Sequence, residues 1–306
     1  MARGVLANWD ASIAERPHLW QFAIPAAVLD LSALDMHGLD DWKELARSGL
    51  SLRNHHTGHA AFFEQVQTAI QAGPGFALLQ RIPVEKVTYR TARLLHVLLG
   101  KSFGELLPQD PEGSYLCDVI DADETREEDR GHVHAPGRRW NDLPCHTDHA
   151  FGIDPPKTVA FLCFRSAGRG GAVRLVSTVT LVERLGASDP TQIETLSRPV
   201  PFDPTRQLDP RDAYLAHAPI LAEAHDGTRF RYLNYQIDLN ALDVQQTRAI
   251  GTLESIISSG EVTCRLFLRP GDVLFVNNMR VLHGRDAYEN ATQLRAPRHH
   301  LRLWLT

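Results

Sequence analysis

In the first hundred residues, helical spacing of apolar positions surrounds one short apolar run. Three stretches, 37–48, 56–73 and 85–100, have apolar residues at helical spacing. Each begins with polar residues and ends at a glycine or serine, so each is predicted to be a helix. Residues 75–83 instead form an apolar run bounded by glycine and proline, which predicts a buried strand. The pattern therefore predicts an α-rich beginning that packs around an early strand.

After residue 140 the pattern changes to short strands separated by Gly/Pro turns. A helix over 243–260 interrupts them. The predicted strands span 158–165, 172–179, 228–237, 262–269, 272–283 and 299–305. Many short strands after a helical start predict a mainly β protein with flanking helices (α+β), built as an antiparallel jelly-roll or sandwich. No glycine-rich fingerprint follows the first strand, which disfavours a doubly wound nucleotide-binding fold.

The length of 306 residues and the 43% apolar composition suit one large domain or two ordinary ones. We expect a single domain over 1–306, in which a helical N-terminal extension, 1–70, packs on a jelly-roll core with inserted helices, 71–306. The sequence contains no internal repeat and no low-complexity linker.

Charge and composition exclude several classes of function. The chain has 32 basic and 37 acidic residues without a basic run, so we expect no nucleic-acid partner. No apolar run approaches the length of a membrane span, and the N-terminus lacks a signal-peptide core, so we expect a cytoplasmic protein with no membrane partner. The four cysteines form no C-x-x-C pair, which favours free buried thiols over a structural zinc site.

Candidate chemistry concentrates in "CHTDHAFG", 145–152. On a strand, His146 and Asp148 would project to one face, while His149 would point away. Imidazole and carboxylate on one face are two of the three ligands that non-haem Fe(II) takes. The alternative is a strand-end turn in which Asp148 caps a backbone N–H. By alternation, His149 is interpreted as structural.

A third ligand must come from a distant strand, and His283 is the best candidate. It closes a strongly apolar strand and precedes Gly284, which allows close backbone approach. The separation from His146 is 283 − 146 = 137 residues, so the two can meet only in a folded core. The alternative is a histidine that caps a turn at the end of the strand.

The last predicted strand has one polar and one apolar face. Arg298, His300, Arg302 and Trp304 share the polar face, and an arginine fork can grip a carboxylate through two hydrogen bonds. Arg298 and Arg302 would lie ~13 Å apart along a strand, so we expect two anionic partners, or one anion and one structural ion pair. The alternative is a solvated edge strand.

Taken together, "HTDHAFGIDPP", the Gly-Gly pair at 170–171, "NNMRVLHGRDAY" and "RHHLRLWL" resemble the taurine dioxygenase and clavaminate synthase-like group of Fe(II)/2-oxoglutarate oxygenases. The resemblance extends from about residue 70 to the C-terminus. It implies a double-stranded β-helix core, O2 as a cosubstrate, and release of succinate and CO2. It also implies iron ligation by His146, Asp148 and His283, a clamp by Arg298 on the distal carboxylate of 2-oxoglutarate, and an acidic substrate group near Arg302.

Two features qualify the resemblance. Relatives usually carry Thr or Ser two residues after the Gly-Gly pair, where this chain has Val173, so Ser177 on the same predicted face is a candidate substitute for binding the keto acid. Asp148 is intact, which disfavours halogenation, since halogenases of this chemistry generally lose that carboxylate. The chain also lacks the cysteine cluster of the zinc-containing relatives that act on trimethylated amines.

Weaker signals concern the substrate. By alternation Asn234 and Gln236 share a face and are candidates to line the pocket. The acidic segment 118–129 is either a lid that meets a cationic substrate or a solvated loop, and the loop is favoured. The histidines of 54–59 are interpreted as helix cap and surface residues.

The preferred hypothesis is hydroxylation of a small, amino-acid-like or carboxylate-bearing molecule that uses Fe(II), 2-oxoglutarate and O2. One alternative keeps this chemistry but acts on a protein side chain. Another is a non-catalytic jelly-roll that binds a small anion through its arginines. The sequence gives neither the substrate nor the oligomeric state.

Overall fold

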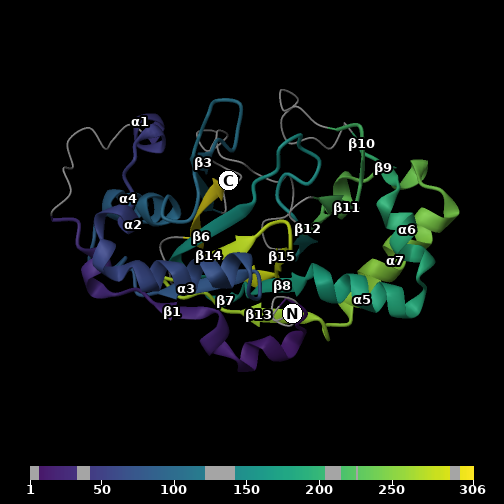
Figure 1. Cartoon of the computed structure of the whole chain (residues 1–306), viewed down its shortest axis with the longest axis horizontal. Helices are drawn as coiled ribbons and strands as arrows, with labels where there is room; N and C mark the ends of the chain where they lie inside the picture. Colours follow the sequence, from purple (N-terminus) through teal and green to yellow (C-terminus); the bar gives the residue numbers. More distant parts are fainter. Residues whose placement is uncertain (1–6, 33–41, 121–141, 204–214, 225–226, 290–296) are drawn as a thin grey trace.

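The computed structural model describes residues 7–32, 42–120, 142–203, 215–224, 227–289 and 297–306. Within them, two β-sheets enclose a shared apolar core, and helices cover the outer side of each sheet (Figure 1). The sheets are open and do not close into a barrel. This is the mainly β architecture with flanking helices that the sequence predicts.

The larger sheet has seven strands in the order β1-β2-β14-β6-β17-β3, with β4 also paired to β17. Parallel pairing of β1 with β2 attaches the N-terminal segment to the sheet edge, whereas the other pairs are antiparallel. The strands are β1 (Gln21–Ala23), β2 (Phe76–Gln80), β3 (Leu106–Leu107), β4 (Leu116–Ile120), β6 (Thr158–Arg165), β14 (Val273–Asn277) and β17 (His299–Leu305).

The smaller sheet has four antiparallel strands in the order β13-β8-β15-β5. They are β13 (Thr263–Leu266), β8 (Val173–Ser177), β15 (Val281–Arg285) and β5 (Leu143–His146). The register between β15 and β5 shifts between His283 and Arg285, which marks a β-bulge in β5, between Leu143 and His146, opposite Gly284.

Alternation along the strands divides the apolar residues among three cores. On β17, Leu301, Leu303 and Leu305 pack outward against α4 (Tyr89–Gly100) in a core that also includes α3 (Ala60–Gln71), which lies against β2 and β14. Between the sheets, the inner faces contribute a second core that includes Phe76, Leu78, Val173, Leu175, Leu266, Leu274 and Val276. The polar side chains of β17 therefore face the space between the sheets, as the sequence predicts.

A third core lies behind the smaller sheet, where α5, α6 and α7 pack together (Figure 1). The capping box of Asp243 and Gln246 fixes the start of α7. The helices are α1 (Trp42–Arg47), α2 (Leu52–His55), α5 (Thr178–Ser188), α6 (Thr191–Ser197) and α7 (Val244–Ser258).

Small hairpins and 3-10 turns complete the described structure. The hairpins pair β9 (Pro199–Pro201) with β10 (His217–Pro219), β11 (Leu221–Ala224) with β12 (Gly227–Phe230), and β7 (Arg169–Gly170) with β16 (Tyr288–Glu289). The 3-10 turns are Ala11–Glu15, Pro17–Leu19, Ala26–Leu29, Thr57–His59, Asn234–Gln236 and Leu239–Ala241.

Three strand predictions were wrong in extent. The stretch 272–283 is two strands, β14 and β15, because the backbone turns at Asn278, whose side chain bonds the loop after β5. The stretch 228–237 is extended only to Phe230 and then forms a 3-10 turn. The β-branched run after Ser177 begins α5, because the Ser177 hydroxyl accepts the N–H of Thr180 as an N-cap.

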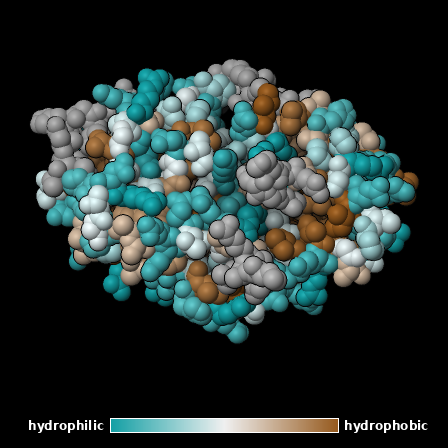
Figure 2. All heavy atoms as spheres, in the orientation of Figure 1, coloured by the Kyte–Doolittle hydropathy of each residue, from teal (hydrophilic) through white to brown (hydrophobic). Residues whose placement is uncertain are grey.

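The surface and the thiols agree with the composition. Hydrophilic residues predominate on the face drawn in Figure 2, and hydrophobic ones gather in small groups. Among the described residues, no helix has both the length and the apolar character to cross a bilayer. The four cysteines are buried. The acidic segment noted in the sequence lies outside the described residues from position 121 onward.

Candidate metal centre

Two histidines from strands far apart in the sequence lie directly opposite each other in the smaller sheet. His146 ends β5 and pairs with His283 on β15, and their ring centroids are 4.6 Å apart. Gly284, opposite the bulge in β5, permits this approach, because a Cβ there would lie 2.6 Å from the carbonyl oxygen of Leu143. The close backbone approach predicted at Gly284 is therefore confirmed.

Asp148 completes a buried group of three side chains. Its Oδ1 lies 3.2 Å from Nε2 of His146 and 3.4 Å from Nε2 of His283. One donor atom from each residue lies within 4.8 Å of the others, and all three residues are buried. Within the part of the chain that the structure describes, this is the one such histidine, cysteine and carboxylate group.

The tautomer of His146 favours a cation at this point. Its Nδ1 lies 2.8 Å from the carbonyl oxygen of Pro144, and only a protonated Nδ1 can donate to that acceptor. A neutral ring then has a lone pair on Nε2, which faces the carboxylate oxygen of Asp148. Two electron-rich atoms at this distance are stable only with a proton or a metal ion between them.

The residues present fit a ferrous ion. Both ring nitrogens of His283 are buried without a hydrogen-bond partner among the described residues, because the contact with Asp148 lacks hydrogen-bond geometry. A buried imidazole in this state is suited to coordinate a metal. Two imidazoles and one carboxylate on one face leave the opposite coordination positions open, which is the ligand set of non-haem Fe(II) oxygenases.

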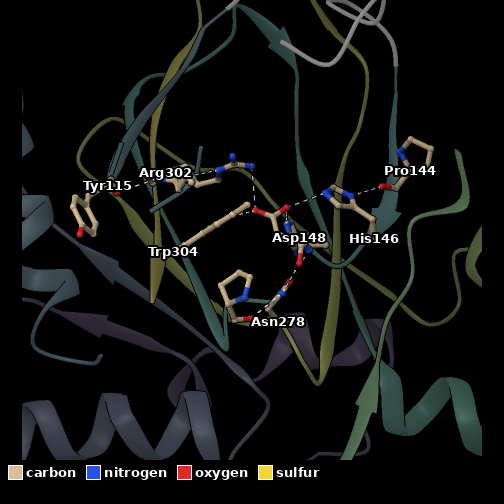
Figure 3. Close-up of polar contacts among 10 residues, drawn as sticks. Tyr115, Pro144, His146, Asp148, Asn278, Arg302 and Trp304 are labelled. Atoms are coloured by element: carbon tan, nitrogen blue, oxygen red, sulfur yellow. Dashed lines mark hydrogen bonds and ion pairs between the residues drawn. The ribbon is translucent and has the colours of Figure 1, made fainter. Parts of the chain in front are cut away.

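The second carboxylate oxygen of Asp148 is held by two side chains of β17 (Figure 3). Trp304 donates its indole N–H to Oδ2 at 2.7 Å, and Arg302 donates from Nη1 to the same oxygen at 3.1 Å. Gln109 accepts from Nε of Arg302 at 2.8 Å and so fixes the guanidinium. These contacts leave Oδ1 to face the two histidines.

The backbone of Asp148 is held as firmly as its side chain. The Asn278 side-chain oxygen accepts the Asp148 N–H at 2.7 Å, and its amide donates to the Asp148 carbonyl at 2.9 Å (Figure 3). Asn278 lies in the turn between β14 and β15, so the same turn positions both Asp148 and the strand of His283.

The protonation states are those that a metal requires. Burial alone would raise the pKa of Asp148, but the charge of Arg302 helps to hold it well below its usual value. Burial lowers the pKa of His283, so its imidazole is neutral near pH 7. An ionised carboxylate and a neutral imidazole can coordinate without first releasing a proton.

We expect Trp304→Phe to weaken metal binding by roughly tenfold, because outer partners of a ligating carboxylate typically contribute that much to affinity. The measurement is a calorimetric titration of the variant with Fe(II) under anaerobic conditions. Trp20→Phe is the matched control, since the Trp20 indole donates a comparable hydrogen bond to the Ile13 carbonyl at 2.9 Å, far from the centre. Equal affinities in both variants would contradict this role for Trp304.

The other residues predicted to bind cosubstrate or substrate have different surroundings. Arg298 is buried between the sheets, with its Nη2 3.1 Å from Nδ1 of His300. Arg302 forms an ion pair with Asp148, which corresponds to the structural ion pair that the sequence analysis left open for one of the two arginines. Ser177 instead donates to the carbonyl of Ala7 at 2.6 Å while it caps α5, so its hydroxyl is already engaged.

The other candidate substrate contacts lie together in one turn. Asn234 and Gln236 belong to a 3-10 turn, and the Asn234 amide donates to Glu254 at 2.7 Å. The preceding Tyr232 bonds Thr147, the residue between the two first ligands, through its backbone. His149 adopts a left-handed conformation, φ 52°, and its ring packs edge-on against Trp304.

Sequence reasoning missed the groups that hold Asp148. Trp304 was placed on the correct face by alternation, but nothing in a strand pattern indicates which acceptor an indole reaches. Asn278 and Gln109 gave no signal, because each acts across more than a hundred residues of sequence.

Residues 41–304 match the family described as "Taurine catabolism dioxygenase TauD, TfdA family". FR-33289 synthase of Streptomyces rubellomurinus is 24% identical over 317 aligned residues, covering 97% of this chain and 88% of that protein. Mitochondrial trimethyllysine dioxygenase of Gallus gallus is 30% identical over 162 residues, covering 50% of this chain but only 39% of the relative.

Solved structures of similar fold cover nearly the whole chain. Asparagine oxygenase, crystallised with Fe(II), 3-hydroxyasparagine and succinate, superposes with a TM-score of 0.69 at 18% identity, over 94% of each chain. The non-haem iron oxygenase OrfP, crystallised with Fe and α-ketoglutaric acid, gives a TM-score of 0.67 at 18% identity, again over 94% of each chain. These likenesses confirm the predicted jelly-roll fold.

Proposed function

Because the chain belongs to the TauD/TfdA family of taurine catabolism dioxygenases, it is an Fe(II)- and 2-oxoglutarate-dependent dioxygenase, and we propose that it hydroxylates a small, carboxylate-bearing, amino-acid-like molecule. The observation that carries the proposal is the buried group of His146, Asp148 and His283, with Nε2 of His283 unpartnered among the described residues. We propose these three residues as the iron ligands.

The chemistry that iron supplies in such a centre is O2-dependent oxidation of a substrate C–H bond, coupled to cleavage of 2-oxoglutarate into succinate and CO2. The protein positions the reactants and excludes water from the space between the sheets. Trp304 and Arg302 keep Asp148 from turning, so that one carboxylate oxygen faces the ligand positions.

We propose that Arg298 binds the distal carboxylate of 2-oxoglutarate. It enters the space between the sheets on the same face of β17 as Arg302, and a buried guanidinium is a strong partner for a carboxylate. We expect Arg298→Gln to raise the KM for 2-oxoglutarate roughly 10- to 100-fold with a smaller effect on kcat. Steady-state kinetics of succinate release measure both constants, and an unchanged KM would place the clamp elsewhere.

Arg302 is the proposed contact for an acidic group of the substrate. It shares Oδ2 of Asp148 with Trp304, and a metal ion on Oδ1 would draw away much of the charge that neutralises this arginine. The loaded site would therefore favour an anion near Arg302. The 3-hydroxyasparagine and L-Arg complexes of the solved relatives support an amino-acid-like substrate.

Asn234 and Gln236 are proposed to line the substrate side. Their turn follows Tyr232, whose backbone bonds Thr147 between two of the proposed ligands. We also propose that the chain acts as one domain, because Trp9 and Trp20 of the N-terminal segment belong to the core between the sheets. A cytoplasmic location is proposed on the sequence alone.

A substrate screen tests the proposed function. The protein is loaded with Fe(II) anaerobically, its iron content is measured, and succinate release is followed with O2, 2-oxoglutarate and individual L-amino acids or their carboxylate-bearing derivatives. We expect about one iron per chain, and succinate release that rises with the true substrate. Tight binding of 2-oxoglutarate without any iron would instead favour a non-catalytic anion-binding protein.

A further inference from the structure

We propose that Arg285 is a second cation for the distal carboxylate of 2-oxoglutarate and that it acts together with Arg298. The inference rests on the proposed function, because it assigns one more contact within the same site. Val173 stands where relatives usually carry a hydroxyl that binds the keto acid, and Arg285 would supply a polar contact in its place.

The strand register directs Arg285 into the space between the sheets. On β15, Arg285 lies two residues after His283, so both side chains project to the same face. Across the sheet it pairs with Val173 of β8, which belongs to the core between the sheets. Arg285 therefore lies on the inner face beside Val173, where the neighbouring strand offers no polar side chain.

The spacing suits the length of the cosubstrate. Two residues along a strand separate His283 from Arg285 by roughly 7 Å. A keto acid held at its keto end beside His283 would extend its distal carboxylate over about this distance. An arginine two positions beyond the metal ligand is thus placed for the far end of 2-oxoglutarate and not for the reacting end.

Arg285 and Arg298 converge on one aromatic ring from the two opposing sheets. The guanidinium carbon of Arg285 lies 4.3 Å from the ring centroid of Tyr288, and that of Arg298 lies 5.3 Å from the same centroid. Tyr288 is buried on β16. The ring gives both cations a fixed support, because an aromatic face attracts a guanidinium.

The Gly-Gly pair gives Tyr288 its place. Gly170 and Gly171 both have a φ of 73°, and a Cβ on Gly170 would lie 2.3 Å from the carbonyl oxygen of Ala287. Glycine is therefore required where β7 meets β16, and it allows Tyr288 to pack beside the arginines.

The charge of this cluster favours an anion. His300 accepts from Arg298 through Nδ1, and burial together with the charge of Arg298 holds the His300 pKa well below its usual value. The imidazole is therefore neutral and adds no charge of its own to the cluster. A carboxylate shared by two guanidiniums gains two charge-assisted contacts and relieves the repulsion between them.

Binding of two keto acids separates this role from simple packing on Tyr288. The full-length protein, loaded with Fe(II) under anaerobic conditions, is titrated calorimetrically with 2-oxoglutarate and with 2-oxovalerate, which has no distal carboxylate. We expect Arg285→Gln to raise the Kd for 2-oxoglutarate roughly 10- to 100-fold and to leave the Kd for 2-oxovalerate within about twofold. Retained 2-oxovalerate binding also shows that the variant is folded.

Arg265→Gln is the matched control, because Arg265 is an exposed arginine on β13 of the same sheet, separated from β15 by β8, and it pairs with Asp286 at 3.3 Å. It should bind both keto acids as the wild type does. Arg285→Lys keeps the charge but loses the planar fork, so its affinity for 2-oxoglutarate should fall between those of wild type and Arg285→Gln. Val173→Thr, added to Arg285→Gln, should restore part of the lost affinity by placing a hydroxyl opposite position 285.

Two results would overturn the inference. One is a 2-oxoglutarate affinity of Arg285→Gln and Arg285→Lys that equals the wild type. The other is an equal loss of affinity for both keto acids, which would show that Arg285 only supports the packing of the pocket. If the iron-loaded wild type binds neither keto acid, the proposed function itself fails, and this outcome is distinct from both.

Discussion

Asp148→Ala should abolish 2-oxoglutarate-dependent succinate release, with a loss of at least about a thousandfold in kcat/KM. The variant removes the one carboxylate of the proposed ligand set and leaves only the two imidazoles of His146 and His283. It also removes the acceptor of Trp304 and the ion-pair partner of Arg302. Iron binding should therefore fall together with activity.

Iron content and succinate release, measured on the same samples, check this expectation. Asp142→Ala is the matched control, because Asp142 is an exposed carboxylate six residues earlier that pairs with Arg174 at 2.8 Å. The control should retain both iron and turnover. An Asp148→Ala protein that still turns over with wild-type kinetics would refute the iron assignment.

Gly284→Ala should move His146 on β5 away from His283 on β15. A Cβ at this position would lie 2.6 Å from the Leu143 carbonyl oxygen and 3.0 Å from the Cys145 backbone nitrogen. Both neighbours are backbone atoms of β5, so the strand that carries His146 must move to relieve the clash. We expect the free energy of unfolding to fall by about 2–3 kcal/mol and the iron affinity to fall roughly 10- to 100-fold.

Gly251→Ala provides a matched glycine control. It lies within α7, and an added Cβ there would meet nothing within 4 Å. Replacing an exposed helical glycine should raise the free energy of unfolding by about 0.5–1 kcal/mol and leave iron affinity unchanged. Denaturant unfolding and Fe(II) titration of both variants give the comparison. A Gly284→Ala protein as stable as the wild type, with normal iron affinity, would show that β5 has room at the bulge.

The elements that local pattern determines were predicted well. Both β6 and β17 have the predicted bounds. β6 is a nearly continuous apolar run that follows a pair of prolines, and β17 alternates between polar and apolar positions. The faces of β17 also agree with the prediction, because Leu301 and its neighbours pack on the helices while Arg302 and Trp304 face inward. His146, Asp148 and His283 could be proposed as ligands from the sequence, because strand alternation and the family resemblance point to the same residues.

What the sequence did not reveal depends on contacts between distant segments. The N-cap at Ser177 overrode the strand propensity of the residues after it, and that hydroxyl became unavailable for the keto acid. The hydrogen bonds of Trp304 and Asn278 to Asp148 join residues more than a hundred positions apart. The proposed role of Arg285 in binding 2-oxoglutarate depends on the strand register, which places Arg285 opposite Val173.

The central place of β17 in the larger sheet has a consequence for synthesis. This strand inserts between β6 and β4, which the ribosome makes long before it. Until His299–Leu305 emerge, the chain carries all three proposed ligands but lacks both side chains that restrain the outer oxygen of Asp148. The restraint on Asp148 is therefore among the last features of the proposed centre that a growing chain can form.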